Sequence, residues 1–302
     1  METRRLRILL ELYRLGSMRD VADAMSITTS TVSQQVAALA KEVGTALIEP
    51  DGRRVRLTPA GRRLAEHSVT ILAAVDAARL DLNPEAEPAG PLRVSGFATA
   101  IRRSLLPIVA DLKRSHPRLR VSILEHEPLE QLALLESDAI DLGLTYDYNL
   151  APAAFDPTLV ARPLWSVPWS LGVPAAAVLG RRRPAEAEPA IRDFRDHDWI
   201  VNSRNTADED VVRTLASIGG FTPHVVHQAD SLALVQDLIV AGFGVGMLPS
   251  DQPTQPGVRL VPFGDPPVLL RAYAVTRRGR ADWPPLALVL RLLGVGASPP
   301  GA

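Results

Sequence analysis

The chain has 302 residues, of which 46% are hydrophobic and 22% charged, and it contains no cysteine. This composition is that of an ordinary globular protein, and it excludes disordered or fibrous chains, disulfides, thiolate zinc sites and cysteine nucleophiles. Residues 1–80 hold 12 Lys and Arg against 9 Asp and Glu, whereas the remainder holds 21 against 25, so a slightly basic N-terminal part precedes an acidic larger part.

The first predicted element is a helix over residues 3–15, which ends at Gly16. Charged residues interrupt its apolar run, so this segment is an amphipathic helix and not a signal peptide. The sequence has no run of about 18 uncharged apolar residues that would suggest a membrane span. Together with the lack of cysteine, this favours a cytoplasmic protein without a membrane partner. Its buried stripe is expected to comprise Leu6, Leu9, Leu10 and Tyr13.

Residues 17–44 predict two short helices joined by a tight turn. Ser17 can cap the first helix, and Asp20 three residues later completes a capping box. Thr28 can cap the second helix. The second helix is expected to face the core with Val32, Val36 and Leu39, which are spaced i, i+4 and i+7.

The opposite face of the second helix carries small hydroxyls and amides. Ser and Thr can bond to bases or phosphates, and Gln can bond bidentately to adenine in the major groove. A solvated polar helix is the alternative, but such faces usually carry Lys and Glu. We therefore predict a DNA-recognition helix with these contact residues: Thr28, Thr29, Ser30, Thr31, Ser33, Gln34 and Gln35.

Two short extended runs flank Asp51-Gly52, which is a hairpin signal. Arg53 and Arg54 follow at the tip. This pattern predicts a wing whose two arginines contact phosphate or the minor groove, and a solvated basic hairpin is the alternative. The wing would complete a DNA-binding domain of residues 1–58.

A long helix is predicted over residues 59–82, because Thr58 can cap it and Pro59 suits the first helical position. Its apolar residues fit a heptad seam, which predicts a dimerising linker helix that holds two recognition helices about one DNA turn apart. Packing on its own chain is the alternative. The seam consists of Leu64, Ile71, Ala78, Val75 and Leu82, and Gly61 and Ser68 complete it poorly.

A Pro-rich linker at residues 83–91 precedes an α/β domain at residues 92–295. Strands and helices alternate there at a pitch that predicts parallel sheets in two lobes around a cleft. Lobe 1 would comprise residues 92–163 and 266–295, and lobe 2 residues 164–265, with a loop at 181–189. The expected strands are 92–95, 119–124, 140–145, 169–173, 199–202, 224–228 and 269–275, and the expected helices 102–115, 129–135, 208–218, 231–241 and 286–293.

Residues 4–64 resemble the N-terminal winged helix-turn-helix of LysR-type transcriptional regulators. The chain departs from the family's pattern at Thr29-Ser30, where relatives often have Gln-Pro, and at Ile48-Glu49-Pro50, where they have Phe-x-Arg, so base preference cannot be carried over. The match rests on Gly16-Ser17, Ala22, Ser33-Gln34-Gln35, Leu39, Gly44, Gly52-Arg53-Arg54 and Leu57-Thr58-Pro59-Ala60-Gly61.

Residues 92–148 and 230–249 are similar to the effector-binding domain of the same family, which has the periplasmic-binding-protein type 2 fold. The resemblance implies a dimer or tetramer that binds an interrupted inverted repeat in double-stranded DNA. It also implies a small-molecule effector between the lobes, and RNA polymerase as a further partner. A small-molecule binder or enzyme of the same fold with a vestigial DNA module is the alternative.

By this analogy the effector lies against the loop after the first strand and against loops of the second lobe. The helix start in the first loop would offer N–H groups to an anion. Relatives often have Ser where this chain has Phe97, which makes the pocket more apolar and argues against a plain carboxylate effector. Residues 125–127 end the second strand; a solvated strand end is favoured for them, and part of the pocket rim is the alternative. For Arg204 a solvated loop position is the alternative to ligand contact. The expected effector-binding residues are Phe97, Ala98, Thr99, Ala100, Ser203 and Arg204.

The sequence shows no catalytic constellation, cofactor motif or metal site. Gly242-x-Gly244-x-Gly246 lies between a helix and a strand, the reverse of the order in a phosphate loop, so it predicts a helix stop. His224 and His227 are three residues apart on a strand and point to opposite faces, which argues against a metal pair. An enzyme is therefore not expected.

Overall fold

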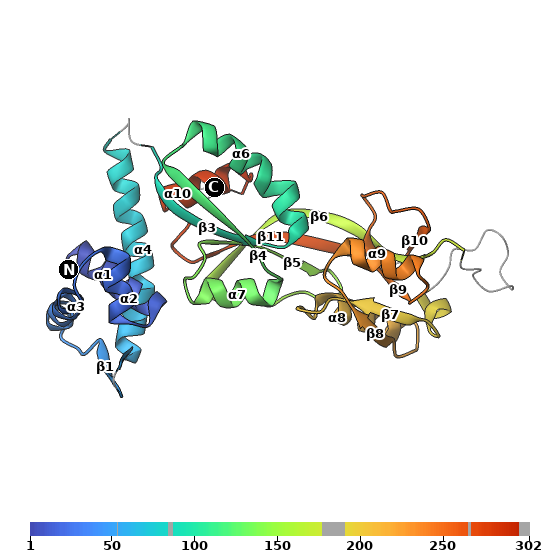
Figure 1. Ribbon diagram of the computed structural model, residues 1–302, viewed down its shortest axis with the longest axis horizontal. Helices are drawn as coiled ribbons and strands as arrows, with labels where there is room; N and C mark the ends of the chain where they lie inside the picture. The colour runs from blue at the N-terminus through green and yellow to red at the C-terminus, as the bar shows by residue number, and fades with distance from the viewer. Residues whose placement is uncertain (53, 84–86, 177–190, 265–266, 296–302) are drawn as a thin grey trace, which may run out of the picture.

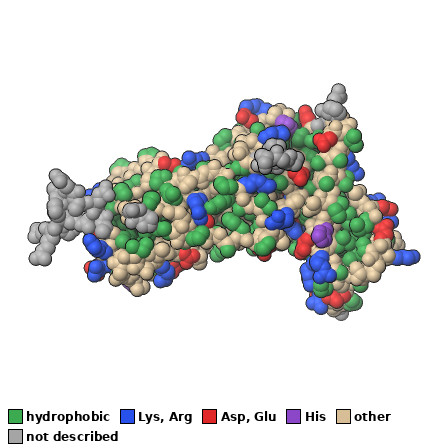
Figure 2. All heavy atoms as spheres, turned by 180° about the vertical axis from the view of Figure 1, so that it is seen from behind, with side chains coloured by type: hydrophobic (Ala, Val, Ile, Leu, Met, Phe, Trp, Pro, Cys, Tyr) green, Lys and Arg blue, Asp and Glu red, His purple; other side chains and the backbone are tan. Residues whose placement is uncertain are grey.

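The computed structural model contains a helical N-terminal domain, a long helix α4 and an elongated α/β domain beside them (Figure 1). It describes residues 1–52, 54–83, 87–176, 191–264 and 267–295. No helix within these ranges is long and apolar enough to cross a membrane. Seen from behind, the N-terminal domain projects from the α/β domain, with side chains of both charges interspersed over the surface (Figure 2).

The N-terminal domain forms the predicted helix-turn-helix and hairpin. Ser17 Oγ accepts a hydrogen bond from the backbone N–H of Asp20 at 3.4 Å, and Thr28 Oγ1 accepts one from Thr31 at 3.1 Å, so both predicted caps are confirmed. The three core residues expected on the second helix are fully buried. The elements are α1 (Thr3–Leu15), α2 (Met18–Met25), α3 (Thr29–Val43), β1 (Ile48–Asp51) and β2 (Arg54–Leu57).

Helix α4 (Pro59–Asp81) packs against α1 with one face, which buries Ala65, Val69 and Leu72. Thr58 Oγ1 accepts from the N–H of Gly61 at 3.0 Å, which confirms the predicted start. The predicted heptad seam lies beside this face. Its members Leu64, Ile71 and Val75 are half-buried, Ala78 is exposed, and Leu82 is 86% exposed.

The α/β domain contains a nine-stranded sheet within the described ranges, and it is mixed, not parallel throughout as expected. β3 (Gly90–Gly96), β4 (Leu119–Glu125) and β5 (Leu142–Tyr148) are parallel in one lobe. β7 (Asp198–Val201), β8 (His224–Gln228) and β9 (Val245–Pro249) are parallel in the other. Two long antiparallel strands join the lobes: β6 (Leu159–Pro174) and β11 (Val268–Arg277).

Strand β6 is much longer than the predicted segment 169–173, and its sixteen residues pass from one lobe into the other. Its partner β10 (Val258–Pro262) was not predicted. The loop expected at residues 181–189 lies outside the described residues. The helices are α5 (Ala98–Ala100), a π-helical turn (Ile101–Leu105), α6 (Leu106–Ser115), α7 (Pro128–Glu136), a 3₁₀ turn (Ile191–Phe194), α8 (Ala207–Ile218), α9 (Leu232–Val240) and α10 (Pro284–Leu292).

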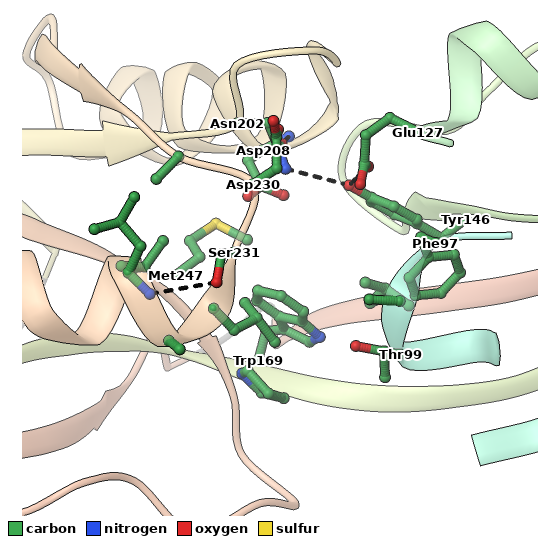
Figure 3. Close-up of a pocket in the computed structure, with 18 of the residues that line it drawn as sticks. Phe97, Thr99, Glu127, Tyr146, Trp169, Asn202, Asp208, Asp230, Ser231 and Met247 are labelled. Atoms are coloured by element: carbon green, nitrogen blue, oxygen red, sulfur yellow. Dashed lines mark hydrogen bonds between the residues drawn. The ribbon is translucent and has the colours of Figure 1, made fainter. Parts of the chain in front are cut away.

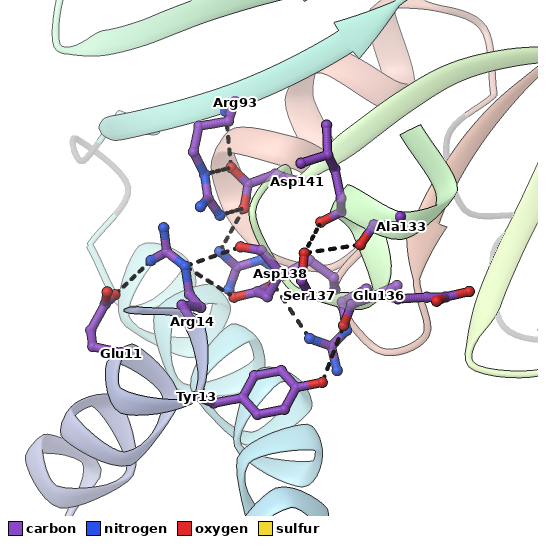
Figure 4. A network of polar contacts seen from close by, with 12 residues as sticks. Glu11, Tyr13, Arg14, Arg93, Ala133, Glu136, Ser137, Asp138 and Asp141 are labelled. Atoms are coloured by element: carbon purple, nitrogen blue, oxygen red, sulfur yellow. Dashed lines mark hydrogen bonds and ion pairs between the residues drawn. The ribbon is translucent and has the colours of Figure 1, made fainter. Parts of the chain in front are cut away.

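The N-terminal domain contacts lobe 1 at the C-terminal end of α7 (Figure 4). Tyr13 Oη donates to the backbone oxygen of Glu136 at 3.2 Å, and Arg14 Nε donates to the backbone oxygen of Asp138 at 3.0 Å. The Asp138 carboxylate is buried and also faces Arg14 and Arg277, at 3.6 and 3.7 Å. Buried charges left unpaired are costly, so this network fixes the loop after α7 against α1.

Candidate functional site

The recognition face of α3 is exposed as the sequence predicts, except at two positions. Thr28, Thr29, Ser30, Ser33 and Gln34 are exposed, whereas Thr31 and Gln35 are half-buried. The hydroxyl of Thr28 is engaged, since it caps the helix and contacts the hydroxyls of Ser30 and Thr31 at 2.8 Å.

The amide oxygen of Gln35 is also engaged, because Arg5 Nε donates to it at 3.1 Å. Arg5 in turn pairs with Glu42 at 2.6 Å. A bidentate contact to adenine needs a free amide oxygen and a free amide nitrogen on the same side chain. Gln34 is therefore better placed than Gln35 to contact a base.

The hairpin has the predicted Asp51-Gly52 turn, in which Gly52 adopts a φ of 60° that glycine tolerates. Arg54 belongs to β2, and its backbone is opposite that of Asp51 across the hairpin. Arg53 lies outside the described residues. Arg56 is paired with Glu49 at 2.9 Å, so its charge is already partly neutralised by its own hairpin.

A cavity of about 530 Å³ lies between the two lobes, which is within the size range of small-molecule sites (Figure 3). Five of the six expected effector-binding residues line it: Phe97, Ala98, Thr99, Ser203 and Arg204. Ala100 is fully buried and does not line the cavity, because the helix starting at Ala98 turns it into the core of lobe 1.

Aromatic rings line one wall of the cleft and continue into the hinge strands. Phe97 meets Tyr146 edge-on with centroids 4.7 Å apart and lies 6.1 Å from Trp165. Tyr148 links Tyr146 to Trp169 through two further edge-on contacts of 5.9 and 5.6 Å. Trp165 is fixed by its indole N–H, which donates to Ser104 at 2.9 Å. The cleft therefore has a rigid aromatic wall.

Tyr146 joins the two lobes at the floor of the cleft. Its hydroxyl donates to Glu127 Oε2 at 3.2 Å in lobe 1. The hydroxyl oxygen of Tyr146 also accepts from the amide of Asn202 in lobe 2 at 3.3 Å (Figure 3). It accepts from the amide of Asn205, in the same lobe, at 3.0 Å. Tyr148 donates to Asp208 Oδ1 at 2.7 Å. These hydrogen bonds satisfy the buried hydroxyls, as low-dielectric sites require.

Two carboxyls at this floor have strongly altered acidity. Glu127 is only 6% exposed, and burial raises its pKa from 4.5 to about 7 despite the hydrogen bond from Tyr146. Burial also raises the pKa of Asp208 from 3.8 to about 6, again against a hydrogen bond from a tyrosine. The solvated strand end expected for residues 125–127 is therefore wrong for Glu127, because its carboxyl is buried against Tyr146 and faces lobe 2.

Ser203 and Arg204 line the cleft but are engaged with Asp230. The backbone and hydroxyl of Ser203 both donate to this carboxylate, and Arg204 Nε donates to it at 3.1 Å. Although burial raises the pKa of Asp230, these hydrogen bonds lower it below its ordinary value. Arg204 also reaches Glu130 of lobe 1 at 3.5 Å, so it spans the cleft.

The sequence analysis considered Glu127 for the rim of the pocket and named Phe97, but it missed the other acidic and aromatic residues of the cleft, above all Tyr146, Trp169, Asp208 and Asp230. Tyr146 lies inside a strand and Asp208 in the first turn of a helix, and their sequence contexts carry no motif. Only the packing of two lobes brings these distant positions together.

The glycine run at residues 242–246 and the two histidines of β8, which the sequence does not assign to a phosphate or metal site, have structural roles. Gly242 and Gly244 have φ values of 79° and 155° at the turn between α9 and β9, as the predicted helix stop requires. His224 Nδ1 lies 2.8 Å from Asp198, and His227 packs edge-on against Phe243. No group of three possible ligands within the described part of the chain could hold a metal ion.

Family models match nearly the whole chain. A model described as a bacterial regulatory helix-turn-helix protein of the lysR family matches residues 3–62, and the LysR substrate binding domain matches residues 85–295. The chain belongs to the LysR family. It is a LysR-type transcriptional regulator with an effector-binding domain, and its curated relatives are transcriptional regulators.

Individual LysR-family relatives are distant in sequence. The chain is 24% identical to the transcriptional dual regulator GltC of Bacillus subtilis over 82% of this chain and 81% of GltC. It is 26% identical to the regulator BenM of Acinetobacter baylyi over 92% and 90% of the two chains. The structure of full-length OxyR from Pseudomonas aeruginosa matches with a TM-score of 0.70 and 20% identity, covering 98% of this chain and 94% of OxyR.

Proposed function

We propose that this LysR-type regulator binds an interrupted inverted repeat near a promoter and that a small molecule in the inter-lobe cleft changes its arrangement on the DNA. The observation that carries the DNA-binding part is the exposed, uncharged polar face of α3, which comprises Thr29, Ser30, Ser33 and Gln34. Such side chains can bond to base edges once the helix enters the major groove.

A two-fold DNA site requires two recognition helices held about one helical turn apart. The half-buried side chains of Leu64, Ile71 and Val75 on α4 are not fully covered by their own chain, and Leu82 is exposed. These residues would pack against the same residues of a second copy. Dimers, or tetramers built from them, are the assembly that this seam supports.

Helix α7 offers a physical connection between the cleft and the DNA-binding domain. It begins next to Glu127, at the floor of the cleft, and ends at Glu136, whose backbone oxygen accepts from Tyr13 of α1. An effector can act only through different affinities for two arrangements of the protein. A ligand that shifts Glu127 would tilt or translate α7 and so displace the contacts that hold α1.

Several curated relatives are named hydrogen peroxide-inducible genes activators. The present sequence contains no cysteine. The sequence therefore offers no thiol for a response to peroxide, and the regulation proposed here depends on reversible binding in the cleft.

The test is binding of the purified chain to DNA from its own promoter region, titrated against salt in excess competitor DNA, with its mass measured in solution. Tight, competitor-resistant binding by a dimer or tetramer is expected, with an affinity that falls as salt rises. Binding no tighter than to competitor DNA would contradict the proposal. A screen for turnover would then test the alternative of an enzyme with a vestigial DNA module.

A further inference from the structure

The charges that line the cleft are predominantly acidic, and its arginines are mostly paired. Arg103 pairs with Asp251 at 2.8 Å, and Arg204 pairs with Asp230, so two of the three lining arginines are neutralised by cleft carboxylates. The third, Arg102, is exposed. The carboxylates that line the cleft are Glu125, Glu127, Asp208, Asp230 and Asp251.

Glu127, which is buried, and Asp208, which is half-buried, differ from the ion-paired carboxylates of the domain. Asp141 and Asp138, in lobe 1, each lie within ion-pair distance of arginines. Within the described part of the chain, Glu127 and Asp208 form no ion pair and have only hydrogen-bond partners. Among the described residues, one buried and one half-buried carboxyl thus lie at the floor of an open cavity without an ion-pair partner, which is the complement of a positively charged group.

The starts of helices α7, α8 and α9 around the cleft also disfavour an anion. The N-terminus of α7 is occupied by its own acidic residues, since Glu130 Oε2 accepts from the N–H of Glu127 at 2.9 Å. Asp208 lies in the first turn of α8, and Asp230 immediately precedes the cap of α9. The partial positive charge of these helix starts therefore already interacts with protein carboxylates. An added anion would meet like charge at each of them.

The aromatic wall suits the same kind of ligand. The rings of Phe97, Trp165 and Trp169 line the cavity and can cover an apolar body. Aromatic faces also attract cations, and Arg103 already lies over the ring of Trp165 at 4.7 Å. The carboxylates can contact the ammonium group of an amine, and the neighbouring aromatic rings can contact its apolar or aromatic part.

We infer that the cleft ligand carries a cationic ammonium or guanidinium group, which lies against Glu127 and Asp208 while its apolar part contacts Phe97, Trp165 and Trp169. This inference rests on the proposed function of the cleft as the effector site. It specifies the chemical class of that effector as an organic cation and excludes a simple carboxylic acid.

The inference predicts a direction for the pH dependence of binding. A cation stabilises the ionised carboxylates, so binding releases protons and tightens as pH rises through the range in which Glu127 and Asp208 titrate. An anionic ligand would show the opposite trend. The charged and titratable groups that face these two carboxyls from neighbouring elements are Tyr146, Tyr148, Arg204, Glu130 and Asp230.

The experiment compares amines with acids of the same skeleton on the full chain. Phenethylamine is paired with 3-phenylpropionate, tryptamine with indole-3-propionate, and putrescine with adipate. Calorimetry and thermal shift at matched ionic strength give the affinities at pH 5.5 and pH 7.5. The variants Glu127→Gln and Asp208→Asn remove the carboxylates, and Glu209→Gln is the matched control, because Glu209 follows Asp208 on α8, pairs with Arg213 and does not line the cleft.

At least one amine should bind about tenfold or more tightly than its acid, more tightly at pH 7.5 than at pH 5.5, and should lose about tenfold in either cleft variant but not in the control. Acids that bind as tightly as the amines, no binding by any amine, or affinity that falls with pH would each overturn the inference. If a variant does not fold, the change in the affinity of the wild-type chain for amines between pH 5.5 and pH 7.5 tests the inference. Promoter binding by the same preparation distinguishes the proposed function from the inference about the ligand. If amines bind but the promoter is not bound, the proposed function is wrong; if the promoter is bound but no amine binds, the inference is wrong.

Discussion

Substituting Glu127 by Gln should change how the stability of the effector domain depends on pH. The carboxyl is buried and has a pKa raised from 4.5 to about 7. Between these values it keeps its proton in the folded chain and loses it in the unfolded chain. The folded state then binds more protons, so the wild-type free energy of unfolding falls as pH rises through this window and levels off above about pH 7.

The size of the effect follows from the same two values. At about 1.4 kcal/mol per pH unit, the interval from 4.5 to about 7 corresponds to about 3 kcal/mol, of which about 2.5 kcal/mol falls between pH 5 and pH 8. The Glu127→Gln variant would lack this loss while retaining an amide oxygen that can accept from Tyr146. The variant should therefore gain about 2.5 kcal/mol relative to wild type on moving from pH 5 to pH 8.

Urea unfolding followed by tryptophan fluorescence measures this difference directly. All four tryptophans, at positions 165, 169, 199 and 283, lie in the α/β domain, so the signal reports that domain alone. Glu125→Gln, at an exposed position on the end of β4, is the control and should show no such gain. A variant and wild type with the same dependence on pH would refute the assignment of a neutral Glu127.

Four further changes test other contacts. Gly279→Ala would place a methyl in steric overlap with the side chain of Thr70 on α4, and it should cost about 1–3 kcal/mol more in urea unfolding than Gly220→Ala. Gly220 has a similar φ and no atom within 4 Å of the added methyl, so equal costs would show that α4 moves away freely. Tyr13→Phe removes one hydrogen bond to α7 and should cost about 1 kcal/mol, with faster hydrogen exchange at the end of α7. Gln34→Ala should lose about 1–3 kcal/mol of discrimination between matched and scrambled DNA in competition binding, whereas equal losses on both would indicate a phosphate contact. A cysteine at Ile71, in this cysteine-free chain, should form a symmetric disulfide dimer on oxidation, and a chain that stays monomeric would contradict the seam.

The ligand charge that the whole cleft favours differs from the one that the loop after β3 favours by itself. The helix start after β3 offers N–H groups, and by itself it favours an anion. Three acidic residues from other elements, Glu127, Asp208 and Asp230, share the same cavity and reverse the balance of charge. The ligand class is therefore a property of the assembled lobes and not of any one loop.

The sequence by itself determined the N-terminal domain almost completely, because its signals are local. Ser17, Thr28 and Thr58 cap helices within three residues of themselves, and the apolar spacing of α3 fixes which face is buried and which is exposed. Most helices of the α/β domain are also set by local periodicity, so their positions were predicted to within a few residues.

Only the tertiary structure decided the hinge and the floor of the cleft. Strand β6 changes from partly exposed to buried along its sixteen residues, so no single alternation marks it in the sequence. Tyr146 meets Asn202 and Asn205 from the other lobe, more than fifty positions away. The acidity of Glu127 depends on burial by elements that are distant in the chain, and burial of this kind exists only once the two lobes have packed together.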